Sequence, residues 1–249
     1  MRRWPSPKPV TSVKFLPSTV NDSNLGVNRE PSSLINPKDL KNLTEKDLKH
    51  QLKKHKATSR RHIFLVRHGQ YNVDGNTDSE KVLTKLGREQ AQLTGKRLAD
   101  LGYHYDHITY STLTRAKETS EIIGQCLQGV ARTGSDLLQE GHPIQPDPCQ
   151  HWRPEVFYYT DGPRIEAAFR KFIHRADHEQ REDSYEIIVC HDNVIRYLVC
   201  RTLQVPPEAW LRMSLHHGSI TELLIHHNGQ VALKGLGDVG YMPAQIITN

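Results

Sequence analysis

The hydrophobic pattern in the second part of the chain predicts short strands that alternate with helices. Strands are predicted at 62–67, 107–111 and 186–190, each bounded by polar residues. The third of these, EIIVC, is a continuous apolar run of the kind found in a sheet that is buried on both faces. The stretches that follow the three strands change to an apolar spacing of three and four residues, which is typical of helices.

Four helices are predicted from this spacing, and their ends carry recognisable signals. They cover 83–102, 112–129, 162–176 and the residues after 191. Thr84 is a good N-cap for the first helix, and Gly102 suits the left-handed conformation at its C-terminal end. Pro163 is expected in the first turn of the third helix, where its missing N–H costs nothing.

Strands that alternate with helices imply an α/β fold with three layers: a mostly parallel central sheet and helices on both of its faces. A C-terminal hairpin is added to this sheet. Two strand-like runs within 219–236 flank Asn228-Gly229, which is a strong signal for a two-residue hairpin turn.

The first 57 residues differ from the rest and are predicted to form a separate N-terminal segment. The stretch before residue 40 is rich in Pro, Ser and Asn without a sustained period, so we expect it to be extended. The basic stretch 40–61 has loose helical spacing. We interpret it as a solvated linker helix, or else as a docking segment for an acidic surface or a membrane. Residues 58–249 are then expected to form one folded domain.

Composition narrows the class of protein only slightly. The four cysteines form no C-x-x-C pair, and the 15 histidines show no metal-ligand spacing, so we predict a reducing compartment and neither a metal nor another cofactor. No apolar run approaches the roughly 18 residues of a transmembrane helix, so no membrane span is predicted. The net charge of +5 suits an acidic partner or substrate, and no nucleic-acid partner is expected.

Basic or ionisable residues stand at or soon after the ends of the three predicted strands, of which the second ends at Ser111. Arg67 and His68 follow the first strand, Arg115 lies in the first turn after the second, and His191 follows the third. Singly, each has an ordinary explanation; Arg115, for example, could pair with Glu118. Together they converge, because the carboxyl ends of parallel strands meet at one edge of the sheet. So many donors in one crevice indicate a compact multivalent anion, and phosphate fits best.

Four sequence blocks carry a resemblance to a known family. FLVRHGQ, LTKLGREQA, STLTRAKET and VCHDNVIRY occur in the order found in the histidine phosphatase (phosphoglycerate mutase-like) superfamily. The stretch LLQEGHPIQPDP is similar to a branch of mitochondrial serine/threonine protein phosphatases within it. The resemblance covers the chain from about residue 58 to the C-terminus.

The resemblance implies a set of roles for individual residues. His68 would be the nucleophile that forms a phosphohistidine, and Glu140 would be the general acid. Arg67, Arg115 and His191 would bind the transferring phosphoryl group, with His191 counted among the catalytic residues as well. Neither a metal nor another cofactor is implied.

The resemblance also implies partners and a location. Phosphoproteins would be the substrates, a protein kinase among the candidates, and the protein would form homo-oligomers in mitochondria, at the outer membrane. Two features depart from the branch. Its Trp-containing assembly motif is replaced by the sequence around Asn21 and Leu25, and its membrane anchor has no counterpart. The cytoplasm is therefore the alternative location.

Two further departures lie beside the expected site. Asp74 stands where many family members have Asn, as it does in the phosphatase branch, and Asp192 stands where the family has a small residue. The Asp192 carboxylate would either face the pocket and repel phosphate, or cap the following helix through the amides of residues 193–195. We expect capping. Two functional alternatives stay open: a small-molecule phosphatase or phosphoglycerate mutase, and a weakly active phosphate-binding scaffold.

Overall fold

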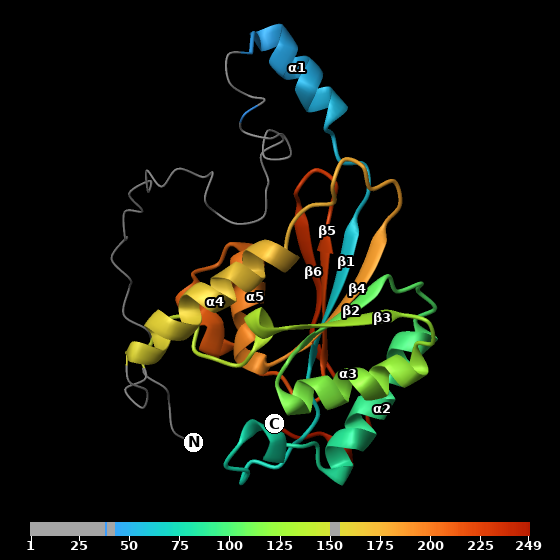
Figure 1. Cartoon of the computed structure of the whole chain (residues 1–249), viewed down its shortest axis with the longest axis vertical. Helices are drawn as coiled ribbons and strands as arrows, with labels where there is room; N and C mark the ends of the chain where they lie inside the picture. Colours follow the sequence, from blue (N-terminus) through green and yellow to red (C-terminus); the bar gives the residue numbers. More distant parts are fainter. Residues whose placement is uncertain (1–37, 39–42, 150–154) are drawn as a thin grey trace, which may run out of the picture.

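The computed structural model describes residue 38 and the ranges 43–149 and 155–249 (Figure 1). Apart from Lys38, the predicted extended stretch before residue 40, including the altered assembly motif, lies outside the described residues. The helices are α1 (Glu45–Lys54), α2 (Lys85–Asp100), α3 (Thr114–Cys126), α4 (Val156–Phe172) and α5 (Asp192–Leu203). The strands are β1 (Arg61–Arg67), β2 (His107–Ser111), β3 (Ala131–Ser135), β4 (Ser184–Cys190), β5 (Ile220–Ile225) and β6 (Val231–Asp238). Short 3-10 helices are η3 (Asp78–Glu80), η4 (Asp136–Leu138), η5 (Pro207–Arg212) and η6 (Ala244–Ile246).

The strands form one sheet in the order β3-β2-β4-β1-β5-β6. The pairs β2–β3, β2–β4 and β1–β4 are parallel, whereas β5 runs antiparallel to both β1 and β6. The predicted mostly parallel sheet is thus confirmed. Strand β3, with the sequence ARTGS, was not predicted. It is an exposed edge strand, so no apolar run marks it in the sequence.

Alternate side chains of β1 divide the core into two layers. Ile63 and Leu65 pack into a cluster with residues of α4 and α5, while Phe64 and Val66 pack into another with residues of α2 and α3. All four side chains are essentially inaccessible. Because successive residues of a strand point to opposite faces, β1 has helices on both sides. Figure 1 shows α4 and α5 on one side of the sheet and α2 and α3 on the other.

The predicted ends of the first long helix agree with the structure. Thr84 caps α2, and its Oγ1 accepts a hydrogen bond from the amide of Gly87 at 3.0 Å. Gly102 ends the helix with a φ of +70°.

Helix α4 begins earlier than expected. It starts at Val156, so Pro163 lies inside the helix rather than in its first turn. Pro163 leaves the carbonyl of Tyr159 without its helical partner, but Tyr159 is exposed and the carbonyl can bond to water. The apolar pattern alone did not reveal this extra N-terminal part.

The C-terminal hairpin exists, with a longer loop than predicted. The last paired residues are His226 and Gln230. The His226 amide donates to the Gln230 carbonyl at 2.8 Å, so three residues lie between them. Gly229 has a φ of +85°, which is the arrangement of a turn that closes through a left-handed glycine. Asn228-Gly229 thus marks the turn correctly but not its length.

Helix α1 confirms a helix in the basic N-terminal stretch. Thr44 caps it, and none of its residues is buried. Figure 1 shows it projecting beyond the end of the sheet where β1 begins. Within the ranges that the structure describes, no helix combines the length and the apolar character needed to cross a membrane.

Candidate active site

The loop after β1 is fixed closely to two helices. Gly69 lies against Gly87 in the first turn of α2, and a Cβ on Gly69 would lie 2.3 Å from the Gly87 carbonyl oxygen. Any larger residue there would force the loop and the helix apart. The Gly69 amide also donates to Thr119 Oγ1 of α3 at 3.1 Å. The residue before Gly69, His68, is therefore held in a rigid position.

The His68 imidazole is buried, neutral and held in one orientation. Its Nδ1 lies 2.8 Å from the carbonyl oxygen of Gly69, which can only accept, so Nδ1 carries the hydrogen. Its Nε2 is then unprotonated, and the lone pair of this nitrogen accepts a hydrogen bond from Arg115 Nε at 3.1 Å. Burial lowers the pKa of His68 well below its usual value, and the charges of His191, Arg115 and Arg67 lower it further. The ring thus presents an unprotonated nitrogen to a cationic surrounding.

Arg115 lies in the first turn of α3 with its guanidinium over the Tyr71 ring, 4.7 Å from the ring centre. The side chain is buried, and Nη1 lies 4.0 Å from Asp78 Oδ1. The ordinary pairing of Arg115 with Glu118 does not occur. Glu118 instead bonds to Arg88 at 2.9 Å. The Arg115 guanidinium therefore lies beside the His68 ring and is not paired with Glu118.

His191 lies at the end of β4, where it is the N-cap residue of α5. Its Nε2 lies 2.8 Å from Ser111 Oγ at the end of β2, and its ring centre lies 5.0 Å from that of His68. Ser111 Oγ also accepts from the Leu113 amide at 3.4 Å, so its own hydrogen is available for Nε2. We assign the Ser111 hydroxyl as the donor to Nε2, which places the hydrogen of His191 on Nδ1. Neither this Nδ1 nor Arg67 Nε has a partner among the described residues, and both are buried.

Asp192 combines the two arrangements that the sequence left as alternatives. Its Oδ1 accepts from the Asn193 amide at 2.9 Å, whereas the Ile195 amide makes an ordinary helical bond. The predicted capping of residues 193–195 is therefore limited to one amide. Oδ2 faces two arginines, Arg67 at 3.6 Å and Arg196 at 3.4 Å. The carboxylate thus lies at the site with its charge offset by these two cations.

Glu140 lies between η4 and α4 and forms a coupled pair with Asp192. Its Oε1 accepts from the Gly141 amide at 3.0 Å, and Arg164 donates to its backbone carbonyl at 3.0 Å. Burial raises the pKa of Glu140 to about 8, and the negative charge of Asp192 adds to this shift. Burial also acts on Asp192, but Arg67 and its second arginine partner hold the pKa of that carboxyl below its usual value. One carboxyl of the pair is therefore protonated at neutral pH and the other is ionised.

The loop that carries Glu140 is anchored by a buried tryptophan. Trp210 of η5 is 1% exposed, and its indole N–H donates to the carbonyl of Ile144 at 2.9 Å. On the other side, α4 approaches closely, since a Cβ on Gly162 would lie 2.5 Å from the carbonyl oxygen of Pro143. The position of Glu140 thus depends on packing at both η5 and α4.

The structure brings the five predicted side chains together. Arg67, Arg115 and His191 surround His68, and Glu140 lies close enough to interact electrostatically with both arginines when it is ionised. Within the described ranges, no three His, Cys, Asp or Glu side chains gather in a way that would hold a metal ion.

His217 is a site residue that the sequence reasoning missed. It precedes β5, is 5% exposed, and has its ring centre 5.6 Å from that of His68 and 6.5 Å from that of Tyr71. It follows no strand end and belongs to no block that resembles the family. The pairing of β5 with β1 is what brings it to the site.

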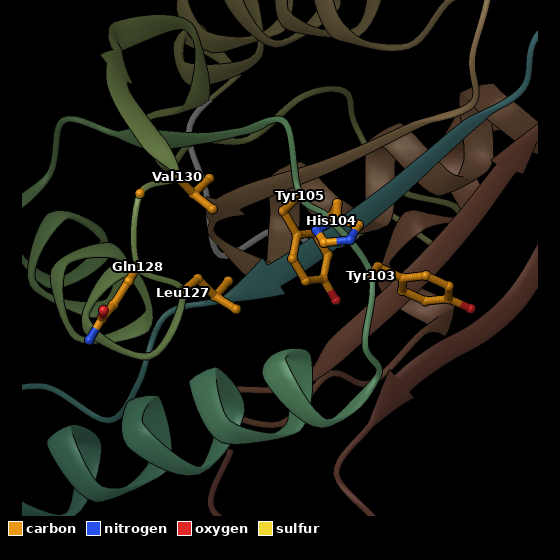
Figure 2. Close-up of a pocket in the computed structure, with 7 residues that line it drawn as sticks. Tyr103, His104, Tyr105, Leu127, Gln128 and Val130 are labelled. Carbon is orange, nitrogen blue, oxygen red and sulfur yellow. The ribbon is translucent and has the colours of Figure 1, made fainter.

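A cavity of about 290 Å³ lies at the other end of the sheet (Figure 2). Its lining includes Tyr103, Tyr105, Leu127 and Val130, which belong to the segments that lead into β2 and β3. The lining contains no arginine and no carboxylate. This cavity therefore lacks the charged groups that distinguish the His68 site.

Residues 63–142 and 139–238 match the histidine phosphatase superfamily (branch 1). The chain belongs to this superfamily. Its curated relatives include the serine/threonine-protein phosphatase PGAM5, mitochondrial, of Xenopus laevis, which is 61% identical over 223 residues, covering 88% of this chain and 81% of that protein. The human protein of the same name is 58% identical over 224 residues, covering 88% and 77%.

Solved structures of other proteins share the histidine phosphatase fold. A phosphoglycerate mutase from Plasmodium falciparum matches with a TM-score of 0.55 and 32% identity, covering 75% of this chain and 96% of that one. An α-ribazole-5′-P phosphatase from Escherichia coli has the same TM-score at 22% identity, covering 72% and 97%. The predicted three-layer α/β fold is thus confirmed.

Proposed function

We propose that the protein is a serine/threonine-protein phosphatase that transfers the phosphoryl group of a phosphoprotein to His68 and then to water. Its relatives at 58 to 61% identity are named serine/threonine-protein phosphatases. The observation that carries the proposal is the buried, neutral His68 ring, whose Nε2 lone pair faces Arg115. An unprotonated nitrogen in a cationic pocket suits attack on a phosphate ester.

In the first step, His68 Nε2 attacks the phosphorus atom and the bond from phosphorus to the serine or threonine oxygen breaks. The departing oxygen needs a proton, because an alkoxide is a poor leaving group. Glu140 is the group that supplies it, since its pKa of about 8 leaves it protonated at neutral pH. The products of this step are the free hydroxyl of the substrate, an ionised Glu140 and a phosphohistidine.

In the second step, Glu140 takes a proton from a water molecule that attacks the phosphohistidine. The bond from His68 Nε2 to phosphorus breaks, inorganic phosphate leaves, and Glu140 is protonated again. Neither step changes the oxidation state of any atom. The pairing of Glu140 with Asp192 fits this cycle, because one carboxyl gives and takes a proton while the other stays ionised.

Hydrogen-bond donors that are already in place would stabilise the negative charge of the phosphoryl oxygens. Arg115 lies within 3.1 Å of the attacking nitrogen, and Arg67 Nε and His191 Nδ1 are buried nitrogens without partners in the described chain. Buried donors that are already oriented stabilise the charge of the transition state without further rearrangement. We therefore assign phosphoryl binding to Arg67, Arg115 and His191.

Rapid-quench labelling tests this assignment. A phosphoserine protein labelled with ³²P should leave acid-labile, base-stable label on the wild-type enzyme and none on His68→Ala. Label that persists in His68→Ala would contradict the role of His68. Parallel assays with phosphoserine peptides and with 3-phosphoglycerate separate a protein phosphatase from a mutase or small-molecule phosphatase. Turnover of 3-phosphoglycerate alone would overturn the proposed substrate class.

The relatives are also named mitochondrial, and we assign this protein to mitochondria with them. Association with the outer membrane, assembly into homo-oligomers and a protein kinase among the substrates are finer parts of the proposal. They are supported by the resemblance alone. Protease protection of intact mitochondria tests the first, light scattering of the purified chain tests the second, and a screen of phosphorylated kinases tests the third.

A further inference from the structure

The His217 ring lies between the nucleophile and the last residues of the chain. Its Nδ1 lies 2.9 Å from Thr248 Oγ1, and its backbone amide donates to the Thr248 carbonyl at 2.9 Å. Nε2, at the other edge of the ring, is buried and has no partner among the residues that the structure describes. The centre of the ring is 5.6 Å from that of His68.

A short relay determines which nitrogen of His217 carries the hydrogen. Gln90 Oε1 accepts from the Gln70 amide at 2.8 Å, and this fixes the orientation of the Gln90 side chain. Gln90 Nε2 then donates to the Ile246 carbonyl at 2.7 Å and to Thr248 Oγ1 at 2.9 Å. The reverse orientation would place two acceptors, or two donors, against each other.

The Thr248 hydroxyl accepts from Gln90 and so directs its own hydrogen elsewhere. We assign His217 Nδ1 as the acceptor of this hydrogen, and the assignment places the ring hydrogen on Nε2. Burial and the nearby charge of Arg67 lower the pKa of His217 to about 4, so the ring is neutral at physiological pH. A buried N–H without an acceptor is unfavourable, and an anion beside it would supply one.

We propose that His217 is a further substrate-contacting residue, which donates its Nε2–H to the phosphoryl group held at His68, and that Thr248 and Gln90 are positioning residues for it. This proposal rests on the proposed function of the same site. It adds a donor that reaches the site from the β5 side of β1, whereas His191 reaches it from β4 on the other side. The ligand chemistry is that of a tetrahedral phosphate oxyanion.

A matched pair of variants tests the donor. His217→Gln keeps an amide N–H near the position of Nε2, whereas His217→Asn keeps a polar group near Nδ1 and removes the donor toward His68. With inorganic phosphate as the probe in isothermal titration calorimetry, His217→Asn should raise Kd by about tenfold, equivalent to about 1.4 kcal/mol. His217→Gln should raise it by no more than about threefold. Melting temperatures show whether each variant is folded.

The outcomes separate this proposal from the proposed function. If the wild type binds no phosphate, the proposed function fails, and the proposal for His217 fails with it. If the wild type binds phosphate and both variants bind it equally well, only the role of His217 is overturned. Equal weakening in both variants would also overturn it, because a merely structural histidine gives that result.

The positioning role of Thr248 has its own readout. In ¹⁵N spectra of the histidine rings, the wild type should show a protonated Nε2 for His217, and Thr248→Val should lose this fixed tautomer. Thr248→Ser, which keeps the hydroxyl, should restore it along with phosphate affinity. A protonated Nδ1 in the wild type would overturn the relay.

Discussion

Strand β1 begins and ends with an arginine, and the two are used in opposite ways. Arg61 is paired at every group: it forms two bonds to the Glu186 carboxylate, at 2.7 and 2.6 Å, and a third to the His174 carbonyl at 2.7 Å. Arg67 is also largely buried, and its Nη1 donates to the Leu215 carbonyl, yet its Nε has no partner in the described chain and its nearest carboxylate, Asp192, is 3.6 Å away. An arginine thus has all of its nitrogens bonded at the beginning of β1, whereas the arginine at the end of β1 keeps one N–H available as a donor.

The surroundings of the two arginines repeat this difference. At the beginning of β1, His62 stacks on Tyr185, which in turn stacks on Tyr103, with ring centres 4.5 Å apart in both pairs. At the carboxyl end, His68 and His191 approach within 5.0 Å without stacking, since their planes are 60° apart. Satisfied contacts stabilise the fold, whereas available donors lower its stability and serve binding. The comparison therefore predicts which changes affect stability and which affect catalysis.

The largest effect is expected from Arg67→Ala. It removes one oriented donor for the phosphoryl group, so kcat/KM on a phosphoserine peptide should fall roughly 1000-fold, about 4 kcal/mol. The melting temperature should fall less than in the Arg61 variant below, because Arg67 makes one hydrogen bond, to the Leu215 carbonyl, and Asp192 keeps Arg196 as a second cation. Steady-state kinetics with calorimetry of the same sample measures both. A large loss of stability with ordinary activity would show that Arg67 stabilises the fold and does not bind the phosphoryl group.

The opposite result is expected for Arg61→Met. It leaves the partly buried Glu186 without its cation and should cost about 3 kcal/mol of unfolding free energy, measured by urea denaturation. Activity of the folded enzyme should be preserved. Its control is the double variant Arg61→Met with Glu186→Gln, which removes both charges and should recover much of the loss.

This pair should also respond to acid. Burial alone would raise the pKa of Glu186, but its bonds to Arg61 hold the pKa below the usual 4.5. The stabilisation is thus present above about pH 4.5 and is lost as the pH falls through the lower folded-state value. The difference between wild type and Arg61→Met should shrink at acidic pH; a constant difference would argue that packing, not charge, is lost.

Glu140→Gln is expected to have an effect that depends on the leaving group. Turnover of a phosphoserine peptide should fall about 100-fold, because the serine oxygen must be protonated as it departs. Hydrolysis of p-nitrophenyl phosphate should fall much less in the phosphorylation step, since nitrophenolate leaves without a proton. Single-turnover assays compare the two substrates. Equal losses would show that Glu140 is not the acid of the first step.

The smallest change is expected for Asp192→Asn. Without the charge of Asp192, the pKa of Glu140 should fall from about 8 by about one unit. The acid form would then be lost at a lower pH, so the alkaline limb of the kcat/KM profile on phosphoserine peptide should move down by the same amount. Because the two carboxyls titrate together, the profile reports the pair. An unmoved limb would mean that Asp192 does not hold the proton on Glu140.

The core of the site could be predicted because it depends on one simple rule of topology. Arg67, His68 and His191 follow strands that are parallel neighbours in the sheet, so their convergence needs only the order of elements. Arg115 was within reach of the same rule, since it opens the helix after β2. The roles given to these residues stay proposals until the variants are measured.

What the sequence did not reveal depends on contacts between distant segments. His217 reaches the site only because β5 pairs antiparallel with β1, and its tautomer depends on Thr248. The pairing of Glu140 with Asp192 joins a loop to the start of α5, and neither residue's pattern predicts the other. The sequence predicts the start of α4 too late, because it places Pro163 in a first turn. A proline in a first turn and one inside a helix with a solvated carbonyl cannot be distinguished in the sequence.

The anchoring of the Glu140 loop by Trp210 gives the protein an intrinsic optical probe. The chain contains three tryptophans, of which Trp210 is the one within the described residues, and it is buried with its indole bonded to Ile144. Replacing Trp4 and Trp152 by phenylalanine would leave a single fluorophore, whose indole bonds to Ile144, four residues along the chain from Glu140. Its emission should be blue-shifted and poorly quenched by iodide. A stopped-flow trace of that emission would then show whether the surroundings of the acid-bearing loop change during turnover.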